Sequence, residues 1–139
     1  QTCALPIWEF VEKYNIPFVS TFGGIDYIEF EHPLNMGSVG IKGTRYGNFA
    51  MQNADLLIIL GSSINSSVVG YDPNQFSIGS KKILVDCDVQ ELYKNIIDID
   101  DKYKVDLKQF FKDMLWHAMN GWKSVIIGKP SGQWLPMIY

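Results

Sequence analysis

Three glycines spaced three residues apart are the part of this sequence best suited to bind an anion. Gly37, Gly40 and Gly43 precede Thr44, which can cap a helix that extends to about Ala54. Because glycine has no Cβ, backbone N–H groups can approach a phosphate closely, and a helix N-terminus favours negative charge. The spacing differs from the dinucleotide fingerprint G-x-G-x-x-G, so a tight loop with positive φ angles is the alternative interpretation.

Two further polar stretches follow apolar runs. Residues 61–63 (Gly-Ser-Ser) come directly after the run 56–60 and offer hydroxyls and open backbone to a ligand, or form a simple turn. Asp86 and Asp88 flank the end of the next apolar run. A carboxylate at such a place often accepts a ribose hydroxyl, and the alternative is that it caps the helix that follows.

Patterns typical of catalytic or metal centres are weak. His32 and His117 are far apart, with no cysteine or histidine at ligand spacing, so a zinc site is not expected. No Ser-His-Asp order and no nucleophile elbow is present. We expect Cys87 to be a small, buried apolar residue.

The composition narrows the function classes further. The 139 residues are 47% hydrophobic and 19% charged, which is typical of one globular domain. The net charge of −3 and the lack of a basic block argue against a nucleic-acid partner. The densest apolar run has five residues, whereas a membrane-spanning helix needs about 20, so no membrane partner is expected. With two cysteines, Cys3 and Cys87, and no secretory signal, we expect a reducing, cytoplasmic location.

The elements that must position these residues alternate between strands and helices. The pattern predicts helices over 8–14, 44–54, 89–95 and 106–119, strands over 16–22, 56–60, 82–86 and 102–105, and long loops over 23–43 and 61–80. This alternation is typical of an α/β domain with a mainly parallel sheet. In such sheets ligands bind beyond the carboxyl ends of the strands, so both long loops should lie on that edge.

Residues 1–7 differ from the rest of the chain. They back-translate, with permitted codons, to CAGACGTGTGCTCTTCCGATC, which looks like a common short-read sequencing adapter. We therefore expect a sequencing-adapter artefact or a disordered tail over 1–7, with no regular structure and no packing of Leu5 or Ile7. The alternative is an ordinary, poorly ordered N-terminus.

Four motifs follow one another along the chain: Ile16–Thr21, Glu31–Thr44, Ala54–Gly61 and Val85–Asp88. By these motifs, in this order, the sequence from about Trp8 to Leu115 resembles the central domain of thiamine-diphosphate-dependent enzymes of the acetolactate-synthase type. The resemblance implies a Rossmann-like parallel sheet with flanking helices that lacks its first strand. It further implies a partial central domain over 8–119 and a linker toward a C-terminal domain over 120–139.

The implied parent enzyme is a 2-keto acid decarboxylase or carboligase, a lyase or transferase. Its thiamine diphosphate and Mg²⁺ would be held by the flanking domains, so this chain carries no catalytic residue and no metal ligand, and alone it would not be an enzyme. Expected partners are those flanking domains, a 2-keto acid and further copies in a homo-oligomer. Two alternatives stay open: a free-standing Rossmann-type nucleotide-binding module, and a non-catalytic structural or partner-binding domain.

Some members of this family also bind FAD. The matching positions are Gly40, Gly43, Thr44, Gly61, Ser62, Asp86 and Asp106. Acetolactate synthases usually have an arginine-rich stretch where residues 63–67 here are Ser-Ile-Asn-Ser-Ser, which cannot pair bidentately with a phosphate. A related decarboxylase or synthase-like enzyme fits equally well. We expect Gly43→Val to weaken nucleotide binding far more than it lowers stability, and Asp86→Asn to weaken binding less.

Overall fold

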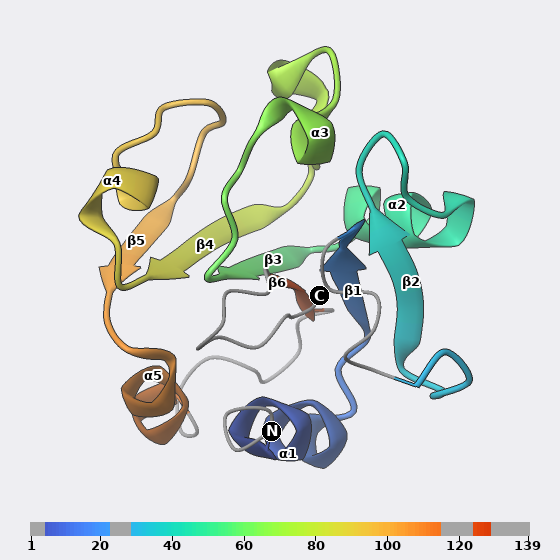
Figure 1. Ribbon diagram of the computed structural model, residues 1–139, viewed down its shortest axis with the longest axis vertical. Coiled ribbons are helices and arrows are strands. Elements are labelled where there is room, and N and C mark those ends of the chain that lie inside the picture. Colours follow the sequence, from blue (N-terminus) through green and yellow to red (C-terminus); the bar gives the residue numbers. More distant parts are fainter. Residues whose placement is uncertain (1–4, 23–28, 115–123, 129–139) are drawn as a thin grey trace.

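The computed structural model describes residues 5–22, 29–114 and 124–128, and in this part of the chain one parallel sheet forms the centre of the molecule (Figure 1). The sheet has six strands in the order β2-β1-β6-β3-β4-β5, and every neighbouring pair is parallel. The strands are β1 (Phe18–Thr21), β2 (Asn35–Val39), β3 (Leu56–Leu60), β4 (Lys81–Asp86), β5 (Asp101–Lys104) and β6 (Ser124–Gly128). The predicted α/β class with a Rossmann-like parallel sheet is confirmed.

Helices flank this sheet. They are α1 (Leu5–Tyr14), α2 (Arg45–Gln52), α3 (Ser66–Val69), α4 (Val89–Leu92), α5 (Leu107–Met114) and the 3₁₀ turn η2 (Pro73–Gln75). Figure 1 shows α1 and α5 together below the sheet, where the rings of Phe10 and Phe111 lie 5.0 Å apart, and α2, α3 and α4 around its upper side. No described helix is long and apolar enough to cross a lipid bilayer.

Two predicted elements, a strand and a helix, match the structure. All five residues of β3 are buried, as a strand covered on both faces requires. The predicted strand over 56–60 therefore matches the observed one. The predicted helix from Thr44 is also confirmed, because Thr44 is the N-cap of α2 and accepts a hydrogen bond from the backbone N–H of Gly47 at 3.1 Å.

Strand β2 corrects the prediction of a long loop over 23–43. Among the described strands it lies at the edge of the sheet and pairs with β1 alone. Only Ser38 and Val39 of its five residues are buried. An edge strand with so little buried surface needs no apolar run, so the hydrophobic pattern did not reveal it.

Strand β6 corrects the prediction of a linker over 120–139. Residues 124–128 lie in the middle of the sheet, with Ile126 opposite Phe18 of β1 and Ile58 of β3. The β-branched run Val125-Ile126-Ile127 is a strand signal that the surrounding Gly and Pro residues obscured. The rest of the predicted linker lies outside the described residues.

The N-terminal helix corrects a third prediction. Helix α1 begins at Leu5, so the expectation of no regular structure over 1–7 was wrong for residues 5–7. Residues 1–4, including Cys3, and the side chains of Leu5 and Ile7 lie outside the described part of the chain.

Candidate functional site

A cleft of about 500 Å³ opens at the carboxyl edge of the sheet, between the ends of β1 and β2 on one side and the end of β3 on the other. It is lined by Thr21, Phe22, Val39, Ile41, Lys42, Ser62, Ser63, Asn65, Ser67 and Val68. From β1 the chain moves to β2 at one edge of the sheet. It then crosses to the other half, where β3, β4 and β5 follow one another toward the opposite edge. The cleft therefore lies at the topological switch point, where open α/β sheets bind their ligands.

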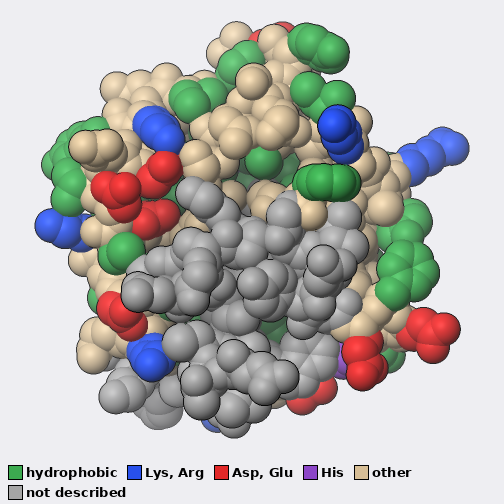
Figure 2. Space-filling view, viewed as in Figure 1, with side chains coloured by type: hydrophobic (Ala, Val, Ile, Leu, Met, Phe, Trp, Pro, Cys, Tyr) green, Lys and Arg blue, Asp and Glu red, His purple; other side chains and the backbone are tan. Residues whose placement is uncertain are grey.

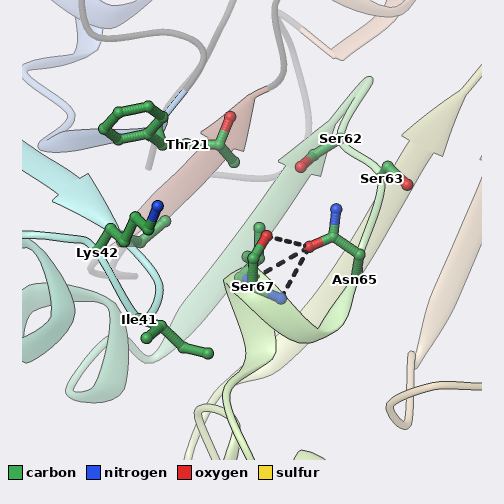
Figure 3. A pocket seen from close by; sticks show the side chains of 10 residues that line it. Thr21, Ile41, Lys42, Ser62, Ser63, Asn65 and Ser67 are labelled. Carbon is green, nitrogen blue, oxygen red and sulfur yellow. Dashed lines mark hydrogen bonds between the residues drawn. The ribbon is translucent and has the colours of Figure 1, made fainter.

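Ser62 provides a buried polar atom in this cleft. The residue is 1% exposed, and within the described part of the chain its Oγ has no hydrogen-bond partner. Figure 3 shows the hydroxyl directed into the space between the two walls. A buried hydroxyl without a partner costs about 1–3 kcal/mol, so a polar ligand group at this position would recover that cost.

Lys42 provides the positive charge on the opposite wall (Figure 3). Among the described residues no carboxylate forms an ion pair with it. Its ammonium lies 5.9 Å from the centroid of the Phe22 ring, and Phe22 and Ile41 form an apolar rim, 65% and 52% exposed. The cleft thus combines a cation, a buried hydroxyl and an apolar rim, which suits a ligand with an anionic group and an apolar ring.

Outside the cleft, a second lysine contacts its lining residue Ser63, and the charge of this lysine is balanced. The Nζ of Lys94 donates to Ser63 Oγ at 3.2 Å and to Glu91 Oε1 at 2.7 Å. Because Glu91 neutralises it, Lys94 orients Ser63 without adding net charge to the cleft.

The start of α3 is closed by its own cap. Asn65 Oδ1 accepts a hydrogen bond from the Ser67 N–H at 3.0 Å and one from the Ser67 hydroxyl at 2.5 Å. It also accepts one from the Val68 N–H at 3.3 Å. These bonds (dashed in Figure 3) hold the loop that forms the wall of the cleft.

The glycines after β2 serve packing. A Cβ at Gly43 would lie 2.5 Å from the carbonyl oxygen of Ser38, and a Cβ at Gly40 would collide with the carbonyl oxygen of Ser67. The Gly40 N–H donates to Asn48 Oδ1 at 2.9 Å. Thr44 is also engaged, since its N–H donates to the Ser38 carbonyl at 2.8 Å and its hydroxyl to the same oxygen at 3.3 Å.

These contacts reverse the expectation for Gly43→Val. The new side chain would press on backbone that cannot move aside easily, so it should lower stability substantially. The close packing at 43–44 favours the alternative that the spacing had left open, a tight loop, over the predicted phosphate cradle.

The predicted carboxylates bind their own backbone. Asp86 Oδ1 accepts from the N–H of Asp88 at 2.8 Å, and Asp88 caps α4 by accepting from Gln90 N–H at 2.9 Å. Asp106 accepts from Lys108 N–H at 2.8 Å at the start of α5. Gly61, with φ of 54°, donates its N–H to the Val85 carbonyl at 2.9 Å.

Cys87 is exposed, which corrects the expectation that it is buried. Partial desolvation and then the charge of Asp86 raise the pKa of its thiol, with smaller contributions from Asp106 and Asp88. The three carboxylates therefore place negative charge around the Cys87 thiol. Figure 2 shows Asp and Glu side chains gathered on the left, near α4. Carboxylates beside the end of β4 disfavour a phosphate there, whereas the Lys42 ammonium in the cleft favours one.

The seven predicted cofactor-binding positions all lie at the carboxyl edge of the sheet, at the end of a strand or just after it. One of the seven, Ser62, lines the cleft. The seven positions do not include the lining residues Thr21, Lys42, Asn65 and Ser67. The position of Lys42 between Gly40 and Gly43 could have indicated an anion site from the sequence. Nothing near Thr21 in the sequence does so, because the pairing of strands in the sheet brings Thr21 to the cleft. No cluster of three potential metal-ligating side chains occurs within the described ranges.

Comparison with known proteins decides the family. A family model described as "Thiamine pyrophosphate enzyme, central domain" matches residues 5–114. This chain belongs to that family. The matched part of this thiamine pyrophosphate enzyme central domain contains β1 to β5 and the whole cleft, and β6 lies beyond it.

Relatives of this central domain are acetolactate synthases. The chain is 33% identical over 105 residues to a probable acetolactate synthase large subunit of Methanococcus aeolicus, which is 76% of this chain and 17% of that protein. It is 33% identical over 127 residues to an acetolactate synthase of Arthrospira platensis, 89% of this chain and 22% of that protein. It is 36% identical over 106 residues to the large subunit of Lactococcus lactis, 76% of this chain and 18% of that protein. The chain thus spans about a fifth of the length of these relatives.

Proposed function

We propose that this chain is the scaffolding central domain of a thiamine-diphosphate-dependent enzyme that decarboxylates or ligates 2-keto acids, and that its cleft binds a nucleotide such as FAD. The nucleotide part is supported by two features on opposite walls of one cleft: a buried Ser62 hydroxyl without a hydrogen-bond partner and a Lys42 ammonium without an ion-pair partner, both judged among the described residues. In the parent enzyme, thiamine diphosphate with Mg²⁺ would supply the electron sink for decarboxylation, and we place it in domains outside this chain.

The described residues fit one part of FAD, namely its phosphate. A phosphate oxygen can accept from the Ser62 hydroxyl and from the Lys42 ammonium, and such charge-assisted hydrogen bonds are stronger than neutral ones. The apolar rim of Phe22 and Ile41 suits a flat ring at the mouth of the cleft. The work of the chain is to hold and orient; it moves no proton.

Two features favour a second candidate, a central domain that supports its neighbours without a nucleotide. The stretch 63–67 has no arginine, and Lys42 is the one lysine or arginine among the cleft's described lining residues. A free-standing nucleotide-binding module is less favoured, because the matched part covers only 17% and 18% of the length of two relatives.

We further propose a cytoplasmic parent enzyme that assembles as a homo-oligomer. The exposed, free thiol of Cys87 fits a reducing compartment.

The test is calorimetric titration of FAD and ADP into the chain. We expect binding to the wild type and about tenfold or more weaker binding to Lys42→Met and Ser62→Ala, since a hydrogen bond to a charged group contributes about 1.5–3 kcal/mol. Lys108→Met removes an exposed positive charge outside the cleft and should leave affinity unchanged. No binding by a folded wild-type chain would favour the supporting role alone.

A further inference from the structure

A second pocket lies at the amino edge of the sheet, where β4 and β5 begin. Its volume is about 650 Å³, and its walls are the segment 73–80, which leads into β4, and the loop 95–100, which leads into β5. Figure 1 shows the arrowheads of β4 and β5 pointing away from these two segments. None of the described residues that line this amino-edge pocket also lines the cleft at Ser62. The two cavities are therefore separate.

Both walls of the amino-edge pocket are held in place. Asp100 Oδ2 accepts a hydrogen bond from the Lys82 N–H at 2.7 Å, and the Asp100 N–H donates to the Lys82 carbonyl at 3.0 Å. The Ser80 hydroxyl donates to the Ser77 carbonyl at 2.9 Å. Three isoleucines of the loop 95–100 pack against the hydrophobic core. The pocket is thus preformed, which reduces the entropy that a ligand must offset when it binds.

Lys82 provides a buried positive charge in this pocket. The residue is 8% exposed, and its Nζ donates to the Ser80 carbonyl oxygen at 3.2 Å. An ammonium has three N–H donors, and no carboxylate of the described residues forms an ion pair with this one. Because a buried charge needs a partner, an anionic ligand group fits beside Lys82.

A second lysine lines the same pocket. Lys102 of β5 lies opposite Leu84 of β4, which is two residues beyond Lys82, so both lysines project from the same face of the sheet. Within the described ranges Lys102 is likewise free of an ion pair. Two ammonium groups on one face increase the attraction for an anion.

Carboxylates on the other wall restrict what this anion can be. Asp98 and Asp100 also line the pocket, so the two lysines and the two aspartates of its lining balance in charge. A bare phosphate or carboxylate would be attracted by the lysines and repelled by Asp98. Hydroxyl groups on the same ligand can donate to Asp98, and the amides of Asn74 and Asn95 offer both donors and acceptors. The best-suited ligand therefore joins one anionic group to several hydroxyls.

We propose that the amino-edge pocket binds a small hydroxylated anion, a sugar phosphate or a sugar acid. Its phosphate or carboxylate lies at the Lys82 ammonium, and its hydroxyls face Asp98 and the two asparagines. Such a contact is charge-assisted and buried, so it contributes more to affinity than the exposed polar contacts around it. The site does not depend on a nucleotide in the cleft at Ser62, since the two cavities share no described lining residue.

The experiment titrates the ¹⁵N-labelled full chain with glycerol 3-phosphate and follows the amide resonances. We expect the largest shifts at Ser80, Lys82 and the loop 95–100, and small shifts around Ser62. Lys82→Met removes the buried charge and should weaken binding about tenfold or more, since charge-assisted hydrogen bonds are the strong ones. Lys104→Met is the matched control, because it removes an exposed charge of β5 outside the pocket and should leave the affinity unchanged.

Related compounds separate the parts of the ligand. Gluconate replaces the phosphate by a carboxylate, so binding of either hydroxylated anion at these amides supports the proposal and identifies the preferred anionic group. Inorganic phosphate should bind at the same amides more weakly, and glycerol should not bind.

Three results would overturn the proposal. The first is that neither glycerol 3-phosphate nor gluconate shifts these amides at millimolar concentration, which the wild-type chain alone decides if Lys82→Met does not fold. The second is a folded Lys82→Met chain that binds as tightly as wild type. The third is inorganic phosphate that binds as tightly as glycerol 3-phosphate, because the hydroxyl contacts would then contribute nothing.

Discussion

Replacing Gly43 by alanine tests whether the glycines after β2 serve packing or ligand binding. The added Cβ would lie 2.5 Å from the Ser38 carbonyl oxygen and 2.6 Å from the Val39 carbonyl carbon, whereas ordinary contact begins at 3.4 Å. The loop must therefore retreat by about 0.9 Å from the end of β2. That movement would also break the 2.8 Å hydrogen bond from Thr44 N–H to Ser38.

The magnitude follows from these two losses. Overpacking against backbone costs about 1–3 kcal/mol, and the lost hydrogen bond about 0.5–1.5 kcal/mol. We expect Gly43→Ala to lower the free energy of unfolding by about 2–4 kcal/mol, measured by urea denaturation with circular dichroism.

Gly79→Ala is the matched control, because a Cβ there meets no atom within 4 Å. It should leave stability within about 1 kcal/mol of wild type, on the stabilising side. If Gly43→Ala and Gly79→Ala are equally stable, the packing explanation fails and the ligand interpretation of Gly43 regains support.

Three further changes are expected to follow from named contacts. Thr44→Ala should destabilise the chain by about 1 kcal/mol, since it removes the cap of α2, and Thr44→Ser should restore most of it in the same urea assay. Ser62→Ala should raise the free energy of unfolding by about 1 kcal/mol, because it removes a buried hydroxyl without a partner. Ser80→Ala should lower it by about 1 kcal/mol, because the Ser80 hydroxyl donates to the Ser77 carbonyl at 2.9 Å. Equal effects of the two changes would contradict the conclusion that the Ser62 hydroxyl has no partner. Cys87 should react with iodoacetamide at pH 8 more slowly in the native chain than in urea, because the raised pKa of its thiol leaves less thiolate. Peptide mass spectrometry measures both rates, and equal rates would contradict this expectation.

The sequence predicted those elements whose signals are local. The run Leu56–Leu60 is typical of a strand covered on both faces, and Thr44 is a residue type that caps helices, so both were recognised. The alternative interpretation of Asp88 as a cap was also local, because the bond to Gln90 spans two residues.

The missed elements depend on contacts between distant parts of the chain. Strand β2 is stabilised by pairing with β1, and β6 by pairing with two strands that lie far earlier in the sequence. The unpartnered state of the Ser62 hydroxyl is likewise a result of tertiary packing, and no pattern in the sequence reports it. Of the seven residues predicted to bind a cofactor, Ser62 lines the cleft, and the other six lie outside it at the same carboxyl edge of the sheet.

Nuclear magnetic resonance of the ¹⁵N-labelled chain titrated with ADP tests the nucleotide cleft most directly. The account predicts that the largest amide shifts occur at Lys42, Ser62 and Ser63, around the cleft between β1 and β3. Amides around Asp86 and Asp106, where the carboxylates repel phosphate, should shift little. Shifts centred on Asp86 and Asp106, or no shifts at millimolar ADP, would contradict it.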